Sequence, residues 1–462
     1  MNHPRSPLLS PTSTASRRAV VTAAGAGALG ALLAACAAPT ATTGGTMAGR
    51  SSKGPVTLEW SSWATDDYGK FREQERIDIW KQLYPESNIT VTMNNFSDYT
   101  TKLKTLLAAG TGPDVFRLGW SNVFPFMEQG QIAELDPFFR KHPRSWLARP
   151  DLKKWIVDGA RYRGKLFGTP MGGDMSSIFI NRNYFRTSQV RMPPDSYREA
   201  RYETEWTFDH VLDAARRLTK PPTVYGIDVS TGSGNPFSLV ESFGGETLSK
   251  DWDAFLWHEE PAIRAWQWLA DLRLVHRVAP SAEENRNYRF QQGNLAMAWT
   301  LVSQMTYRTM DVKDAFDWDQ TVWPHLEGKK PKVMFWYSAW CLNKETKHPD
   351  EAFLWLHHVS GPDGTRPGVE LGWELPLFKE MDPLYNKRIA EWKKNVKPAL
   401  EGLDFAIKRH YYHHPRWSQA WNDYIGPAID DIKAGKQGAA QALRAIKGPV
   451  DELLKEGAAL MR

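Results

Sequence analysis

The chain has 462 residues, of which 24% are charged, and its formal net charge is +5 at neutral pH. The first 35 residues contain three arginines and no acid, so the chain from residue 36 onward carries only +2. Such a small excess gives no electrostatic reason to expect a nucleic-acid partner. The length allows two lobes with substantial cores, and the two cysteines exclude a dense disulfide framework.

The first 35 residues have the pattern of an export signal. A twin arginine at 17–18 precedes an apolar run over 19–35 that is rich in Ala and Gly. A charged segment, an apolar segment and small residues at a cleavage point are typical of secretion signals, and paired arginines favour twin-arginine (Tat) export. Leu33-Ala34-Ala35-Cys36 resembles a bacterial lipobox, in which the cysteine takes a lipid and becomes the new N-terminus. We therefore expect removal of residues 1–35 and a lipid anchor at Cys36, on the outer face of the cytoplasmic membrane.

Two other interpretations of this region are weaker. A transmembrane helix would have to span the membrane with 17 apolar residues, at the short limit for a span. The pattern G-x-G-x-x-G at 25–30 indicates dinucleotide binding only between a strand and a helix, and here it falls inside the expected signal. Neither interpretation accounts for the cysteine at 36.

Residues 36–54 are rich in Ala, Thr, Gly and Ser, which predicts a flexible tether. From residue 55 onward, apolar residues alternate over 56–60 and 89–93, and 115–118 is mainly apolar. These three predicted strands are separated by helical patterns over about 70–84 and 98–110. A β-α-β-α-β order with such connections predicts a parallel sheet covered by helices.

Aromatic and acidic residues follow two of these strands. Trp63 and Asp66 come after the first strand, and Trp120 follows the third. In open α/β sheets, ligands bind beyond the carboxyl ends of the strands. Indole faces suit the apolar faces of sugar rings, and carboxylates accept hydrogen bonds from hydroxyl groups. The high content of 21 Trp agrees with this interpretation, although either Trp could instead pack beneath its loop.

Further segments, in order along the chain, resemble the extracellular solute-binding proteins of bacterial ABC importers, specifically their carbohydrate-binding branch. The resemblance covers nearly all of 55–462, although a usual Lys is missing near 294 and Ile180-Asn181 stands where Tyr-Asn is common. The matching segments are 106–115 (LLAAGTGPDV), 130–137 (GQIAELDP), 164–170 (GKLFGTP), 292–297 (QGNLAM), 348–354 (HPDEAFL) and 417–454.

The resemblance implies an α/β, two-lobed periplasmic-binding-protein fold of type II, with a ligand cleft between lobes joined by hinge strands. We place a first crossing near 171–174, where Gly172-Gly173 would accommodate unusual backbone angles, and a return near 322–326. Lobe 1 is then expected to contain 55–172 and about 326–360. Lobe 2 is expected to contain about 173–325 and 361–462.

Five more residues are candidate ligand contacts. An acid near the hinge could accept hydrogen bonds from sugar hydroxyls, and the aromatic residues could form walls. Structural alternatives exist for four of them: the acid at 174 could cap the next element, the Trp residues at 299 and 336 could be buried in the core, and the Trp at 373 could be an exposed loop anchor. The five candidates are Asp174, Trp299, Trp336, Trp373 and Glu374. The His-rich segment 410–414 invites a metal interpretation, but adjacent histidines rarely supply ligand geometry and second-shell support together, so we expect no metal.

The predicted function is capture of a carbohydrate, which we expect to be an oligosaccharide, and its delivery to an ABC permease by a monomer without cofactors. No G-x-S-x-G, H-E-x-x-H or P-loop motif indicates an enzyme. One alternative is a surface-anchored glycoside-processing enzyme, although neighbours such as Asp66-Asp67 do not establish the carboxylate separation it needs. Another is the same fold with a non-sugar ligand such as a polyamine or a phosphodiester. Arg72 and Arg117 lie near the strand ends but form no evident cluster in the sequence.

Overall fold

The computed structural model describes residues 54–95, 98–142, 144–158, 160–228, 235–281, 284, 289–408 and 411–461, without the side chain of Tyr412. The export signal, Cys36, almost all of the tether and His410 therefore lie outside the described residues. Within the described part, no helix is both long and apolar enough to cross a membrane.

The first sheet has five strands in the order β2-β1-β3-β11-β6. The strands β1 and β2, and likewise β1 and β3, pair in parallel, whereas β11 is antiparallel to β3 and β6. The parallel part confirms the sheet predicted from the alternation of the first three strands. The bounds are β1 (Val56–Ser61), β2 (Ile89–Met93), β3 (Val115–Gly119), β6 (Thr169–Pro170) and β11 (Ser338–Leu342).

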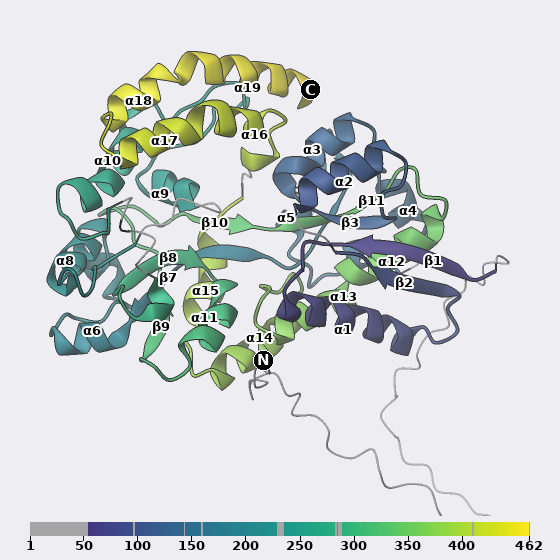
Figure 1. Ribbon diagram of the computed structural model, residues 1–462, viewed down its shortest axis with the longest axis horizontal. Helices are drawn as coiled ribbons and strands as arrows, with labels where there is room; N and C mark the ends of the chain where they lie inside the picture. Colours follow the sequence, from purple (N-terminus) through teal and green to yellow (C-terminus); the bar gives the residue numbers. More distant parts are fainter. Residues whose placement is uncertain are drawn as a thin grey trace, which may run out of the picture. The chain divides into compact units, whose positions relative to one another are not determined.

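Helices cover both faces of this sheet. Figure 1 shows α2 and α3 on one side and α1 and α13 on the other. Helix α1 begins where the carboxylate of Asp66 accepts a hydrogen bond from the amide of Gly69 at 2.8 Å, and Pro85 follows its end. The bounds are α1 (Asp67–Leu83), α2 (Tyr99–Ala108), α3 (Trp120–Glu128), α12 (Pro349–Ser360) and α13 (Pro362–Glu370).

The second sheet is built around β7 and is antiparallel except for one pair. Its order is β12-β10-β7-β8, and β9 also pairs with β7. Only β10 and β12 run in parallel. The bounds are β7 (Asp174–Asn181), β8 (Met297–Leu301), β9 (Trp318–Thr321), β10 (Val333–Trp336) and β12 (Ala406–Ile407).

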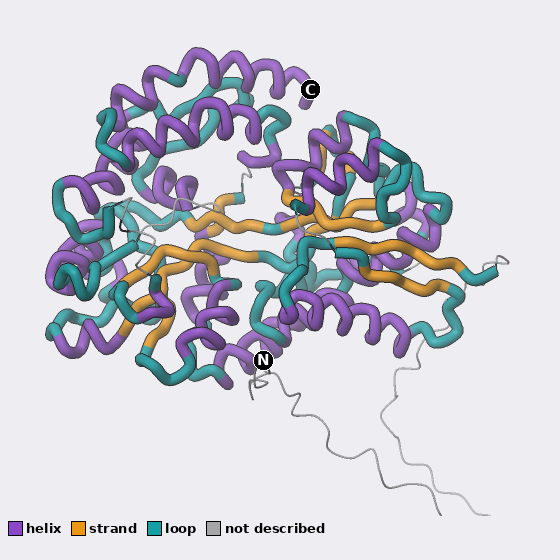
Figure 2. The backbone as a smooth tube through the Cα atoms, in the orientation of Figure 1, coloured by secondary structure: helices purple, strands orange, loops and turns teal. Residues whose placement is uncertain are grey.

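The chain passes between the two sheets in very short segments, visible in Figure 2 as loops between orange strands. Residues 171–173 connect β6 with β7, and Tyr337 alone connects β10 with β11. The return therefore lies at Tyr337 rather than near 322–326, because 333–336 still pairs with β7 or β12. A third contact joins Gly173 and Leu375 through two backbone hydrogen bonds of 3.0 and 2.7 Å.

The lobes that the sequence predicts correspond to elements packed on each sheet, here named lobe 1 and lobe 2. Helix α13 packs against α1 of lobe 1, so the start of lobe 2 at 361 was wrong for this helix. The C-terminal helices contact both lobes, since α17 and α18 pack on α10 whereas α16 packs on α3. Their bounds are α10 (Glu260–Leu274), α16 (Trp417–Ala420), α17 (Gly426–Lys433), α18 (Ala439–Ala445) and α19 (Lys447–Met461).

The remaining elements complete the two lobes and their connections. They are α4 (Asp136–Lys141), α5 (Lys154–Asp158), β4 (Arg161–Tyr162), β5 (Lys165–Leu166), α6 (Arg182–Thr187), α7 (Tyr202–Glu205), α8 (Phe208–Leu218), α9 (Asn235–Ser242), α11 (Gln304–Val312), α14 (Asp382–Glu391) and α15 (Lys397–Glu401).

Most of the Trp side chains belong to the core rather than to the surface. Trp60 of β1, for example, has ring centroids of Trp340 and Trp355 at 5.1 and 5.0 Å. Packing between the first sheet and α12 therefore accounts for part of the Trp content that the sequence analysis associated with recognition.

Candidate functional site

A stack of alternating aromatic and guanidinium groups lies between α1 and the edge of the first sheet. The guanidinium carbon of Arg117 is 3.7 Å from the ring centroid of Trp63 and 5.5 Å from that of Trp373. The guanidinium carbon of Arg72 also lies over Trp373, 3.8 Å from its ring centroid. Arginine is attracted to aromatic faces at such distances. We name these four residues the Trp–Arg stack.

Each member of the stack comes from a different element. Trp63 follows β1, Arg117 is on β3, Arg72 is on α1, and Trp373 follows α13. Both indoles are half-buried, whereas both arginines are buried. The stack therefore presents partly exposed aromatic rings at the carboxyl ends of parallel strands, where open α/β sheets bind ligands.

Helix α11 of lobe 2 reaches the same place. The backbone carbonyl of Leu371 accepts hydrogen bonds from the hydroxyl of Tyr68 on α1 at 2.9 Å and from that of Thr306 on α11 at 3.4 Å. The rings of Tyr68 and Tyr307 are 5.9 Å apart. Burial raises the pKa of Tyr68 far above its ordinary value, so this hydroxyl stays protonated and remains a donor. The segment 371–373 thus lies where both lobes meet.

A network of buried ion pairs lies next to the segment 371–373. Glu73 accepts from Arg72 at 2.6 Å and from Arg76 at 2.8 Å, while Glu374 accepts from Arg76 at 2.6 Å. These four side chains are at most 2% exposed. Although desolvation opposes it, the two neighbouring arginines hold the pKa of Glu73 below its ordinary value. The network ties the segment after α13 to α1.

Glu374 is therefore placed in the ion network and not on an accessible wall. It fills the space next to two glycines, because a Cβ at Gly172 would stand 2.3 Å from the Glu374 Cβ, and one at Gly368 would stand 2.4 Å from its carboxyl carbon. The role that this placement supports is to position Trp373, its neighbour in the chain.

Asp174 of β7 and Trp336 of β10 are opposite each other in the antiparallel pair formed by these two strands. They lie where the chain enters and leaves the second sheet. Both are half-buried. The carboxylate of Asp174 accepts hydrogen bonds from the amide and hydroxyl of Ser303 at 2.9 and 2.5 Å and from the amide of Met175 at 2.8 Å. Burial raises its pKa to about 6 despite these bonds.

The other predicted residues occupy different settings. Trp120 is 0% exposed and packs on Tyr337 and His413, with ring centroids 5.1 and 4.8 Å away. Trp299 is 2% exposed and packs against Trp323 at 4.6 Å. Both therefore lie in the core. Asp66 is exposed, and one of its oxygens caps α1. The structure brings Trp63 and Trp373 together, and their contact with a ligand stays a prediction.

Arg72 and Arg117 were noted near the strand ends but were not expected to join the site, and Tyr307 was not expected at all. A signal was present at Arg117, which interrupts an otherwise apolar strand at 115–118. For Arg72 the sequence indicated only its place near the strand end, because its partners Glu374 and Trp373 lie about 300 residues further along the chain.

The described histidines of the His-rich segment lie in the interior. His413 and His414 are 4% and 1% exposed, and His414 Nε2 lies 3.1 Å from the carbonyl oxygen of Leu454. Among the described residues, no three His, Cys, Asp or Glu side chains are grouped as metal ligands.

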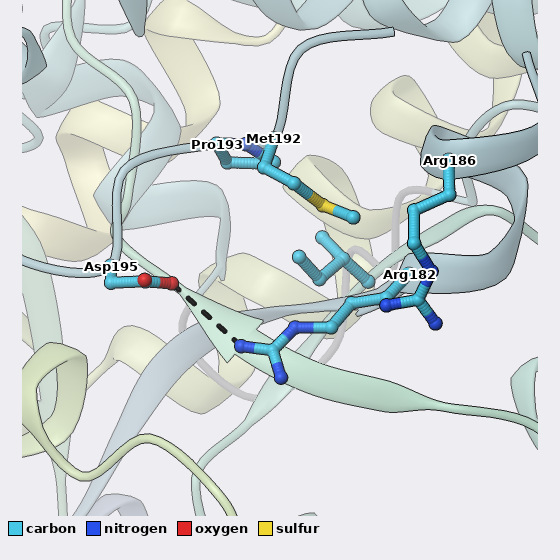
Figure 3. A pocket seen from close by; sticks show the side chains of 6 residues that line it. Arg182, Arg186, Met192, Pro193 and Asp195 are labelled. Carbon is cyan, nitrogen blue, oxygen red and sulfur yellow. Dashed lines mark ion pairs between the residues drawn. The ribbon is translucent and has the colours of Figure 1, made fainter. Parts of the chain in front are cut away.

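A separate surface pocket of about 360 Å³ lies at the other end of β7 (Figure 3). Its arginines already have acidic partners, since Arg182 pairs with Asp319 at 2.8 Å and Arg186 with Asp317 at 2.8 Å. Figure 3 also shows Arg182 directed toward Asp195, 3.8 Å away. The pocket contains no aromatic side chain, which distinguishes it from the Trp–Arg stack; its lining residues are Ile180, Arg182, Arg186, Met192, Pro193 and Asp195.

Comparisons with known proteins agree with this architecture. An erythritol/L-threitol-binding protein of Mycolicibacterium smegmatis is 23% identical over 398 residues, which are 78% of each chain. An ABC substrate-binding protein from Listeria monocytogenes, solved in complex with cycloalternan, has a TM-score of 0.73 at 20% identity and covers 86% of this chain and 98% of its own. The GacH receptor of Streptomyces glaucescens, solved unliganded and with acarbose, has a TM-score of 0.72 at 16% identity, covering 87% and 100%.

These likenesses confirm the two-lobed periplasmic-binding-protein fold. The similar proteins are binding proteins, and the family model that matches this sequence describes extracellular solute-binding proteins. Residues 68–366, well over half of the chain, match the family model, and the protein therefore belongs to the bacterial extracellular solute-binding proteins.

Proposed function

We propose that this protein captures a carbohydrate between its two lobes and delivers it to an ABC permease. The observation that carries the proposal is the meeting of two half-buried indoles, Trp63 and Trp373, with Tyr307 of the opposite lobe. The sugar ligands named for the solved neighbours support the same ligand class.

The chemistry suits a sugar. The face of Trp63 that is turned away from Arg117 would pack on the apolar C–H face of a sugar ring, and the accessible part of Trp373 would contact the ligand beside it. The exposed carboxylate of Asp66 would accept hydrogen bonds from hydroxyl groups. Trp336 and Asp174, across the crossing, would extend the contact to lobe 2. The protein would bind and release its ligand by closure and opening, so that no covalent bond changes.

The proposal is tested by thermal shift and calorimetry with a panel of mono- and oligosaccharides. A ligand that binds only the folded state raises the melting temperature. We expect Trp63→Ala and Trp373→Ala each to weaken binding by about tenfold or more, because each removes a buried aromatic face worth about 1.5–3 kcal/mol. Phe71→Ala is the control, since Phe71 is an aromatic residue of α1 that is 40% exposed. Shifts with peptides, and none with sugars, would refute the ligand class.

We further propose that the mature chain begins at a lipid-modified Cys36, after Tat export. The sequence of the signal and lipobox supports this proposal. An anchor at this position, followed by the 36–54 tether, would hold the binding lobes at high effective concentration near a permease in the same membrane.

A further inference from the structure

The buried charges beside the Trp–Arg stack do not balance. The two carboxylates of the ion network, Glu73 and Glu374, are bound by Arg72 and Arg76. These four groups together are neutral. Arg117 is a third buried guanidinium on the same side of the sheet, and it adds one positive charge.

Arg117 has little compensation from the described protein. It is 5% exposed, and its Nη2 donates one hydrogen bond to the hydroxyl of Ser338 at 3.1 Å. Its Nε and Nη1 are buried and have no hydrogen-bond partner among the described residues. The acids that act on its charge are Glu73 and Glu374, which are hydrogen-bonded to Arg72 and Arg76, although Oε2 of Glu374 has no hydrogen-bond partner among the described residues. The face of Trp63 provides its closest cation–π contact.

An uncompensated charge at this depth is costly. Buried charges in proteins are normally paired, and an unpaired one destabilises the fold. Burial, together with the neighbouring charge of Arg72, lowers the pKa of Arg117 to about 9, which still leaves it protonated at neutral pH. Arg117 is therefore a buried cation without an ion-pair partner among the described residues, and it lies against the partly exposed indoles of the Trp–Arg stack.

We propose that the ligand is an anionic carbohydrate, whose carboxylate or phosphate group is bound by Arg117 beside Trp63. This inference rests on the proposed function and specifies its substrate class. A carbohydrate with an acidic group would place its ring against Trp63 and its anion at Nε and Nη1 of Arg117, which requires the side chains that cover these buried nitrogens to move aside. The hydroxyls of a neutral sugar could accept the same hydrogen bonds, but they would leave the charge uncompensated.

The position of the charge favours a ligand group over a structural one. Trp63, which covers the guanidinium, belongs to the surface loop that also carries the exposed Asp66, so the stack is next to solvent. Asp66 itself is hydrogen-bonded to the start of α1. In the poorly polarisable surroundings of the stack, attraction between an incoming anion and Arg117 is stronger than it would be in water.

The test uses isothermal titration calorimetry with matched pairs of sugars. Uronic acids and their oligosaccharides are compared with the corresponding neutral sugars, and hexose phosphates form a second arm that separates phosphate from carboxylate. We expect the acidic member of at least one pair to bind at least tenfold more tightly than its neutral counterpart, because hydrogen bonds between charged groups are stronger than those to neutral hydroxyls.

Three variants test whether the charge of Arg117 causes the preference for the acidic sugar. Arg117→Gln should remove the preference for the acidic member, so that the two sugars of a pair bind with affinities within about threefold of each other. Arg117→Lys should retain part of the preference, since it keeps the charge. Arg186→Gln, with a half-exposed arginine remote from the stack, is the matched control and should retain the whole preference.

A second measurement distinguishes a binding role from a structural one. Without ligand, Arg117→Gln should melt at the same or a higher temperature than the wild type, because it removes an unpaired buried charge. A large loss of stability on this substitution would instead show a structural role and overturn the inference. Equal or tighter binding of neutral sugars would also overturn it while leaving the proposed function intact. Failure of every sugar, acidic or neutral, would refute the proposed function itself.

Discussion

At the scale of single residues, sequence position identified aromatic residues but could not decide which of them are accessible. Trp63 and Trp120 both follow strands of the first sheet, yet Trp63 is half-buried and Trp120 is fully buried. The difference arises because residues around Tyr337 and His413 close over Trp120 from distant parts of the chain. Such long-range packing has no local pattern in the sequence.

Asp174 gives a prediction about pH. The pKa of this carboxyl is about 6 in the folded protein, above its ordinary value near 4, because of burial. The folded state therefore binds the proton more tightly, and the resulting stabilisation is complete below about pH 4 and is lost as the pH rises through 6. Relative to Asp174→Asn, we expect the wild type to lose about 1–2 kcal/mol of unfolding free energy between pH 4 and pH 7.

Urea unfolding at several pH values measures this difference. Asp213→Asn corrects for the change in net charge, since that side chain is 66% exposed. A difference between wild type and Asp174→Asn that stays constant across the range would contradict the prediction.

At the scale of elements, the contacts around 171–173 explain why two glycines occur there. Gly172 lies against Glu374, and a Cβ at Gly173 would stand 1.9 Å from the ring of Phe335. From the sequence alone, the two glycines at the crossing were expected to provide backbone freedom. The structure gives a different reason, which is close packing against side chains of β10 and of the segment after α13.

Gly172→Ala should therefore disturb the crossing. Its Cβ would stand 2.3 Å from that of Glu374, so the two segments must separate, with an expected cost of about 1–3 kcal/mol in unfolding free energy. Chemical denaturation measures the loss, and we expect sugar affinity to fall with it. Gly448→Ala is the control, because a Cβ there meets nothing within 4 Å and α19 should become equally or more stable. Equal stability of Gly172→Ala and the wild type would refute this account of the crossing.

At the scale of the whole molecule, local patterns predicted the first sheet but not the complete path of the chain. The alternation in 56–60 and 89–93 is visible in the sequence, and these segments form β1 and β2. The return to lobe 1 was placed too early because β9 and β10 are both short, and only their pairing with β7 shows that they belong to lobe 2. The ion pairs of the buried network could not be predicted from the sequence either, since Arg76 and Glu374 are 298 positions apart.

The anchor proposed for the whole molecule has a direct test. Intact-mass measurement of protein purified from its native membrane should show a chain that begins at Cys36 and carries the mass of a lipid. Cys36→Ser should abolish the lipid and release the protein from the membrane fraction. A native chain that retains residues 1–35 without modification would refute the anchor.

The short crossings limit how the lobes can move. Residues 171–173 and Tyr337 contribute only two soft backbone torsions each, and the hydroxyl of Tyr337 is bonded to the carbonyl of Ile156 at 3.1 Å. Rotation about so few bonds confines any lobe motion to a nearly fixed trajectory. Ligands of different sizes would then be accommodated by side-chain rotamers along that trajectory, and the extent of closure would be set by the backbone rather than by the ligand.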